Sequence, residues 1–223
     1  HGDWKRGNLR IARNQGGITA VIAKATQGVH FQDPTFERTV AEARLLSLLV
    51  GAYHFGDASD GAAQAEAFLA KTADARATGR LLLCLDLENN PNPRRGTMGL
   101  GQALAFVRRV HEAVGTWPVC YTGRYIRAAQ EAPGTDLARC PLWMAAYGPD
   151  PLRGKLPAAW SAWALWQYTN GGAGPVDQVR YPRKTPGFGK GGTAPGGCDR
   201  SVFRGTAEEL RAWWDSQAVG HGP

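Results

Sequence analysis

Short apolar runs and longer amphipathic stretches alternate along the chain. Runs that are rich in β-branched and aromatic residues and are bounded by Gly, Pro or Asn are typical of strands, whereas apolar residues that recur with the helical period indicate helices. Helical stretches separate most of the runs, which is the order expected of an α/β fold. The predicted strands are residues 19–26, 49–55, 81–88, 117–122, 141–147, 163–169 and 198–203.

Apolar stripes and capping residues predict the helices. Asp33 and Pro34 are expected to open a helix that ends by Leu48, because Asp favours the N-cap and Pro the first helical position. Further helices are expected from about residue 62, over residues 98–114, and after Thr206, where Glu209 completes a capping box. The residues expected to face inward are Phe36, Val40, Ala43, Ala65, Phe68, Leu69, Thr72, Leu100, Leu104, Val107 and Val110.

This alternation predicts the fold class, an α/β TIM-like barrel with parallel strands joined by right-handed crossovers. A chain of 223 residues has the size of one such barrel, so residues 1–223 are expected to form a single domain. In barrels of this kind, the C-terminal ends of the strands and the loops after them build the active site. Functional residues are therefore expected where the strands end.

Composition and charge limit the kinds of molecule that the protein is expected to bind. No stretch approaches the ~20 consecutive apolar residues of a membrane span, and residues 1–5 contain no signal-peptide core. The formal net charge of +7 favours an anionic partner. Basic residues form no long block, and zinc-finger and RNA-recognition motifs are absent, so nucleic acid is not the expected partner.

The cysteines do not indicate a metal site. Cys84, Cys120, Cys140 and Cys198 lack the CxxC and Cys–His spacings of zinc sites, and no nucleotide-binding motif follows a strand. A zinc site and a nucleotide cofactor are therefore not indicated. Cys84 and Cys120 lie in apolar strands and are interpreted as small core residues, while disulfide pairing stays open.

The most informative stretch is RLLLCLDLENN, residues 80–90, an apolar run that ends in two carboxylates. Asp86 and Glu88 are two apart on a strand and therefore point to the same face, with backbones roughly 6.6 Å apart. Paired carboxyl groups at such a distance can cleave a glycosidic bond, one as the acid and the other as the charged partner. The alternative is a solvated strand end.

Further polar and aromatic residues occur at the predicted strand ends. Each aromatic side chain among them could contact a sugar or simply pack, and Gln167 could bind an acetamido group or satisfy a buried carbonyl. His54 is interpreted as a structural histidine. The candidate substrate-binding residues are Lys24, Tyr53, Tyr121, Trp143, Tyr147, Gln167 and Tyr168.

Together these motifs resemble one known family. The segments AKATQG, GAYHF, LDLE, CYTG, PLWMAAY, WALWQY and CDRSVFRG occur in this order over nearly the whole chain, and their succession is similar to glycoside hydrolase family 25, the Chalaropsis-type lysozymes. The resemblance implies a flattened barrel and an N-acetylmuramidase that needs no cofactor. It also implies that Glu88 is the general acid, Asp86 its partner and Asp199 a further acidic site residue.

The substrate and the place of action are implied by the same resemblance. Family members cut the β-1,4 bond between N-acetylmuramic acid and N-acetylglucosamine in bacterial peptidoglycan. The expected protein is a secreted or periplasmic monomer that acts at the cell wall. A carbohydrate-binding module that kept the fold and lost catalysis is the alternative, and a nucleic-acid-binding protein is a more distant one.

The sequence also departs from the family pattern. Members begin with a strand that ends in Asp-Val-Ser, and this chain starts after that point, with Asp3 a poor substitute. A barrel without that strand would leave a gap between residues 19–26 and 198–203. Such a gap should be filled, because unpaired buried backbone groups are costly. We expect upstream residues to fill the gap; direct closure into a seven-stranded barrel ranks second, and a strand donated by another segment or chain third.

Two details of the C-terminal part complete the prediction. Asp199 is preferred over Asp177 as the acidic site residue, because Phe203, Gly205 and the capped helix follow it at the family spacing. The segment between Tyr168 and Cys198 is rich in Gly and basic residues and is expected to hold the anionic wall polymer. Its basic residues are Arg180, Arg183, Lys184 and Lys190.

Overall fold

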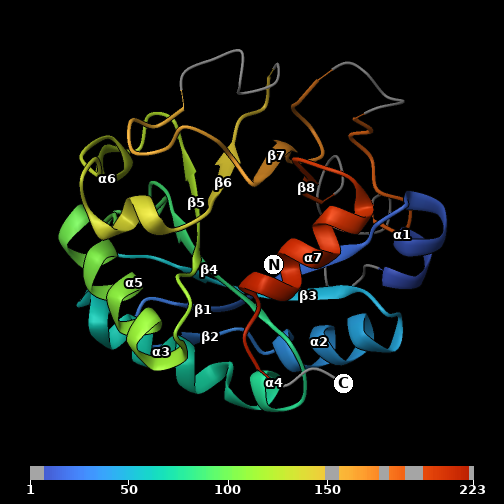
Figure 1. Ribbon diagram of the computed structural model, residues 1–223, viewed down its shortest axis with the longest axis horizontal. Helices are drawn as coiled ribbons and strands as arrows, with labels where there is room; N and C mark the ends of the chain where they lie inside the picture. Colours follow the sequence, from blue (N-terminus) through green and yellow to red (C-terminus); the bar gives the residue numbers. More distant parts are fainter. Residues whose placement is uncertain (1–7, 149–155, 176–180, 189–197, 221–223) are drawn as a thin grey trace.

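The computed structural model describes residues 8–148, 156–175, 181–188 and 198–220. They form a curled, eight-stranded sheet with the strand order β2-β1-β3-β4-β5-β6-β7-β8, flanked by helices (Figure 1). The predicted strands are confirmed to within a few residues, and β3 has the predicted bounds. The strands are β1 Ala20–Gln27, β2 Phe31–Gln32, β3 Leu49–Phe55, β4 Leu82–Leu87, β5 Val119–Gly123, β6 Leu142–Ala145, β7 Leu165–Thr169 and β8 Arg200–Phe203.

The helices include all those predicted and some that were not. The short helix α1 was missed, and so were α4, α6 and the 3-10 turn η2, which are too short to show a helical period. The helices are α1 Leu9–Gly16, α2 Phe36–Leu45, α3 Gly61–Lys71, α4 Ala73–Ala77, α5 Leu100–Val114, α6 Arg127–Gln130, η2 Asp136–Arg139 and α7 Ala207–Gln217. The inward positions are confirmed in α2 and α3, whereas Leu100 and Leu104 of α5 are only partly buried.

The expectation of a barrel built from parallel strands alone is wrong. β1 and β3 to β7 are parallel, but β2 pairs antiparallel with β1 and β8 pairs antiparallel with β7. β2 follows β1 after residues 28–30, and a connection that short can only make a hairpin. The described residues between β7 and β8 contain no helix that could carry the chain back along the sheet. The fold is therefore a mixed α/β half-barrel.

The gap expected beside β1 is not closed by β8. The described strands show no ladder between β1 and β8, since β1 pairs with β2 and β3 and β8 pairs with β7. Both strands instead border one cavity of about 1050 Å³. Direct closure into a seven-stranded barrel is thus wrong, and β2 covers only the C-terminal end of the free edge of β1.

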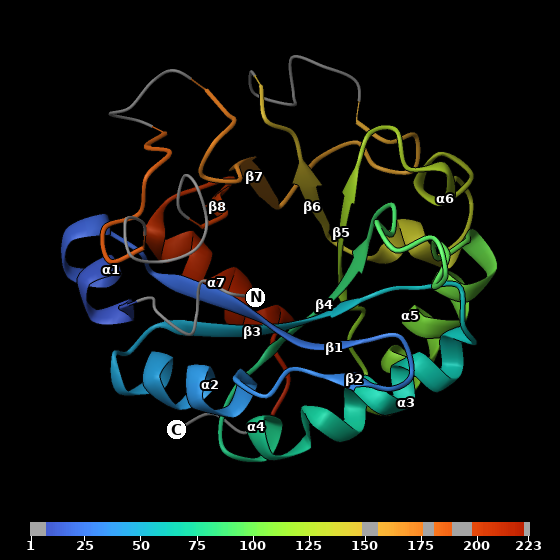
Figure 2. The same ribbon diagram turned by 180° about the vertical axis from the view of Figure 1, so that it is seen from behind.

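Among the described residues, three apolar clusters hold the sheet: an outer one, an inner one, and a third around β6 and β7. The outer one packs α2, α3 and α5 against the sheet, and all residues of β4 are buried between the two sides. The inner one contains Leu210 and Trp214 of α7, which contact Leu82 and Cys84. Figures 1 and 2 show α7 lying on one side of β1 and β3. Cys84, Cys120 and Cys140 are fully buried thiols, so the interpretation of Cys84 and Cys120 as core residues is confirmed.

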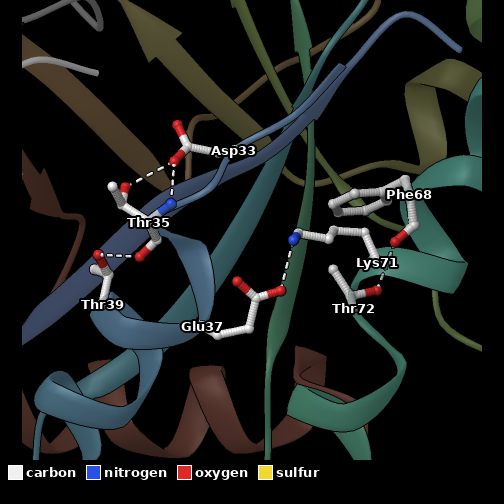
Figure 3. A network of polar contacts seen from close by, with 7 residues as sticks. All are labelled: Asp33, Thr35, Glu37, Thr39, Phe68, Lys71 and Thr72. Atoms are coloured by element: carbon white, nitrogen blue, oxygen red, sulfur yellow. Dashed lines mark hydrogen bonds and ion pairs between the residues drawn. The ribbon is translucent and has the colours of Figure 1, made fainter. Parts of the chain in front are cut away.

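The start of α2 differs slightly from the prediction. Thr35 is the N-cap residue, and the Asp33 carboxylate accepts hydrogen bonds from the Thr35 amide and hydroxyl at 2.8 and 2.7 Å (Figure 3). Glu37 in the first turn pairs with Lys71 of α3 at 2.5 Å. Asp33 is thereby fixed in place rather than serving as the cap itself.

The capping box at the start of α7 supports a stability prediction. Thr206 Oγ1 accepts from the Glu209 amide at 3.2 Å, and Glu209 Oε2 accepts from the Thr206 amide at 2.7 Å. We expect Thr206→Ala to lower the free energy of unfolding by about 1 kcal/mol in chemical denaturation, because one capping bond is lost. Thr206→Ser keeps the hydroxyl and is the control; equal losses in both variants would contradict the capping role.

Candidate active site

The cavity reaches the C-terminal ends of the strands, where the sequence predicted the site, and extends along β1 to its N-terminal end and to α7. Every site residue predicted from the sequence borders it. The carboxylates come from the end of β4 and from the start of β8, and the aromatic residues come from β3, β5, β6 and β7 and the loops after them. The predicted residues around the cavity are Lys24, Tyr53, Asp86, Glu88, Tyr121, Trp143, Tyr147, Gln167, Tyr168 and Asp199.

Asp86 and Glu88 both have raised pKa values, and the charge of Glu88 acts on Asp86. Burial raises the pKa of Asp86 well above its usual value, and the charge of Glu88 raises it further, whereas Lys24 lowers it. Burial and then the charge of Asp199 raise the pKa of Glu88, again opposed by Lys24. Asp86 Oδ1 is buried and has no hydrogen-bond partner among the described residues. Two carboxyl groups with raised pKa values favour a state that holds one proton and one negative charge.

A β-bulge in β1 decides which side chains reach the cavity. The pairing of β1 with β3 shifts register between Lys24 and Thr26, so the inward and outward positions exchange there. Lys24 and Gln27 therefore both border the cavity, and Lys24 Nζ donates to Gln27 Oε1 at 2.6 Å. Thr26 instead bonds His54, on the helix side of the sheet.

His54 is a structural residue, as the sequence indicated. Gln64 Nε2 donates to the carbonyls of Asp57 and Ser59, which leaves its Oε1 to accept from His54 Nε2 at 2.9 Å. His54 Nδ1 must then accept from Thr26 Oγ1 at 2.8 Å. Burial lowers the pKa of His54 to about 4, so the ring is neutral at ordinary pH and takes no part in proton transfer at the cavity.

The wall opposite Lys24 is aromatic. The Tyr121 and Trp143 rings meet edge to face at 4.9 Å, and Trp143 Nε1 donates to Ser201 Oγ at 2.9 Å. Gln167 Nε2 donates to the Tyr147 hydroxyl at 2.8 Å, and Tyr147 is 42% exposed. Gln167 thus orients a ring that is open to the cavity.

Tyr53 and Tyr168 are more enclosed. Burial and the charge of Asp86 raise the pKa of Tyr53 well above its usual value, and Tyr53 borders the cavity together with Asp86 and Glu88. Tyr168 is 2% exposed, packs against Trp166 and Tyr181, and donates to the Pro182 carbonyl at 2.9 Å. The Tyr168 side chain therefore supports the wall from outside rather than facing its open side.

The structure adds residues near the carboxylates that the sequence did not single out. The Lys24 ammonium lies 4.9 Å from the centre of the Phe55 ring and 5.4 Å from that of Phe31, and the charge of Asp33 acts on it. Phe31 belongs to a strand of two residues, which is too short to predict, and Asp33 was interpreted only as a helix cap. Phe55 belongs to the GAYHF segment that the sequence analysis singled out, but its contact with Lys24 could not be predicted from that segment.

Some predictions lie outside the described residues. Asp3, Asp177, Arg180 and Lys190 are among these, so the choice between Asp199 and Asp177 stays a prediction. Among the described residues, no group of His, Cys, Asp and Glu is arranged to hold a metal ion. Within the same residues, no helix combines the length and apolar character needed to cross a bilayer.

A half-barrel with paired acids and aromatic walls at the strand ends defines a glycoside hydrolase. The sequence model described as glycosyl hydrolases family 25 matches residues 3–175, and the chain belongs to that family. It is therefore an enzyme of the glycoside hydrolase class, as its motifs indicated.

Individual relatives agree with this assignment. The chain is 27% identical over 186 residues to the N,O-diacetylmuramidase of Chalaropsis sp., covering 74% of this chain and 87% of the relative. It is 28% identical over 222 residues to the uncharacterized protein YegX of Escherichia coli K12, covering 96% and 69%. Among solved structures, a muramidase from Acremonium alcalophilum superposes with a TM-score of 0.65 at 29% identity, covering 92% of each chain.

Proposed function

We propose that the protein is a muramidase that cleaves the β-1,4 bond between N-acetylmuramic acid and N-acetylglucosamine in bacterial peptidoglycan. The observation that carries the proposal is that Asp86 and Glu88, two carboxyl groups with raised pKa values, border the same cavity of about 1050 Å³. Such a volume accommodates a few sugar rings. The family of the chain and the muramidase relatives support the same substrate.

The two carboxyl groups have different roles in this proposal. Glu88 is the more accessible of the two carboxyl groups and donates its proton to the glycosidic oxygen as the bond to C1 breaks. Burial alone would favour the proton on Asp86, so this assignment requires the charge of Lys24, which lowers the pKa of Asp86. Asp86 remains charged and stabilises the positive charge that develops at C1. Water then adds to C1 and returns a proton to Glu88, which restores the pair. Asp199 acts through its charge, which raises the pKa of Glu88.

The remaining cavity residues are proposed to bind the glycan. Tyr147 and Trp143 offer ring faces on which sugars stack, and Tyr121 and Gln167 hold them in place. Tyr53 borders the cavity together with Asp86 and is proposed to contact the sugar at the cleavage point. The protein would act as a secreted or periplasmic monomer at the cell wall, and it would need no cofactor.

Product analysis tests this function against the alternative of a non-catalytic binding module. A muramidase digest of purified peptidoglycan should release fragments with N-acetylmuramic acid at the new reducing end, identified by borohydride reduction and mass spectrometry. Binding to sacculi without new reducing ends would establish the module instead. Reducing-end N-acetylglucosamine would assign cleavage to the other glycosidic bond.

The basic segment before β8 is proposed to hold the anionic wall polymer. Lys184 is exposed and Arg183 half-buried, with Arg183 Nη1 donating to the Gly172 carbonyl at 3.2 Å. We expect Arg183→Ser with Lys184→Ser to weaken sedimentation with sacculi at low salt and to flatten its salt dependence, because exposed charges act through a screened field. Cleavage of short neutral fragments should not change.

A matched control removes two charges from the outer face. Arg108 and Arg109 lie on α5 and pair there with Asp136 and Glu66. The double Ser variant at these positions should leave binding to sacculi unchanged. Equal binding by both double variants would make the segment before β8 a mere connection.

A further inference from the structure

Lys24 is the most unusual charged group in the cavity. The proposed glycan site is open to water, yet the Lys24 side chain at its border is buried. It is 7% exposed, with Nζ bonded to Gln27 Oε1 at 2.6 Å and placed over the rings of Phe55 and Phe31. A side chain held on three sides in this way has little surface left for a sugar. Its surroundings therefore point to a role other than contact with substrate.

The groups that face Lys24 come from every neighbouring element. Gln27 lies on β1, Phe31 on β2, and Tyr53 pairs with Lys24 in the register of β3. Asp33 follows β2, while Asp86 and Glu88 lie at the end of β4, and all three carboxylates act on the ammonium group. On the helix side, the Lys24 charge also disfavours protonation of His54. The cation thus stands among carboxylates and has a fixed position.

The β-bulge is what fixes this position. In a regular strand, residues three apart point to opposite faces, so Lys24 and Gln27 could not bond each other. The register shift before Thr26 brings both to the cavity side, and the hydrogen bond then sets the direction of the long lysine side chain. Bulges commonly re-aim a side chain next to an active site.

We propose that Lys24 is a positioning residue for charge, whose ammonium group keeps Asp86 and Glu88 in the state that holds one proton and one negative charge. The inference rests on the proposed function, because it assigns to that reaction the cation that balances the Asp86 carboxylate. Without the cation, both carboxyl groups stay protonated up to a higher pH. Asp86 is then neutral in the pH range in which Glu88 holds the proton that it donates. Burial lowers the pKa of Lys24 to about 8, so the cation is present over the acidic and neutral range.

The test compares pH profiles. In Lys24→Met, we expect the pKa that governs the acid limb of kcat/KM to rise by about one unit, because an opposite charge at this range shifts a carboxyl pKa by about that much. Activity on the acid limb should then fall about tenfold relative to the wild type at the same pH. Lys24→Arg keeps the charge and should restore the position of the acid limb.

Two controls separate a charge effect from a loss of structure. Lys71→Met removes another mostly buried lysine that pairs with a carboxylate, on α3 and away from the cavity, and it should leave both limbs in place. If Lys24→Met does not fold, Lys24→Gln is the second neutral variant. A lower activity at every pH with unmoved limbs would overturn the proposal.

A readout without substrate keeps the inference distinct from the proposed function. The carboxyl ¹³C resonances of Asp86 and Glu88 can be titrated by NMR in the wild type and in each variant. We expect higher pKa values for the pair in Lys24→Met than in Lys24→Arg. Shifted titrations in a wild-type protein that releases no reducing ends would refute the muramidase function alone, whereas unchanged titrations would refute the role of Lys24.

Discussion

Glu88→Gln is expected to remove nearly all activity, lowering kcat by about 10² to 10⁴, which is the usual contribution of a general acid. Gln has the same shape but has no proton of suitable acidity to give to the glycosidic oxygen. The measurement is the initial rate of reducing-end release from peptidoglycan. Glu112→Gln makes the same chemical change on the exposed face of α5 and should leave the rate unchanged.

The residual rate decides the role of Glu88. More than about a tenth of the wild-type rate in Glu88→Gln would be incompatible with general-acid catalysis. Binding to sacculi should persist in the variant, because Glu88 is proposed to act in the bond-breaking step and the aromatic wall is untouched. Loss of binding together with activity would indicate a positioning role instead.

Asp86→Asn is the second variant with a large expected effect, again a strong loss of kcat but with the fold intact. The charge that stabilises the developing cation at C1 is removed, while the size of the side chain is kept. Unchanged turnover would dismiss the paired-carboxylate mechanism. The measurement is the same rate assay, run beside thermal unfolding.

Stability gives this variant a second signature. Burial raises the folded-state pKa of Asp86 above that of the unfolded chain, so the ionised group destabilises the fold once the pH exceeds the unfolded value. The Asn side chain does not ionise and avoids this cost. We therefore expect the Tm of Asp86→Asn to equal or exceed that of the wild type at neutral pH, and the gain to vanish at a pH below the unfolded value.

The sequence predicted those parts of the fold that depend on local patterns. β3 is recognisable because its apolar run lies between Ser47 and the polar turn that begins at Gly56. α7 is recognisable because Thr206 and Glu209 form a capping box. The antiparallel direction of β8 could not be inferred, since a strand pattern carries no information about direction. The hairpin partner β2 has two residues and no pattern at all.

The site could be predicted in part from the same local patterns. The parts that could not be predicted depend on how the strands pair. Residues at strand ends converge in any barrel, so the carboxylates and aromatic residues could be placed together before their contacts were known. The bulge in β1 depends on pairing with β3 and leaves no mark in the sequence, so the position of Thr26 on the helix side could not be predicted. Asp33 follows β2 directly, and its charge acts on Lys24. This arrangement depends on β2, which the sequence did not predict.

The buried cysteines bear on the chemical durability of the molecule. Oxidants and alkylating agents attack the thiolate, and burial raises the pKa values of Cys84, Cys120 and Cys140. These thiols stay protonated and out of reach as long as the core is closed. In this part of the protein, resistance to oxidative damage is a property of the packing and does not depend on reducing surroundings.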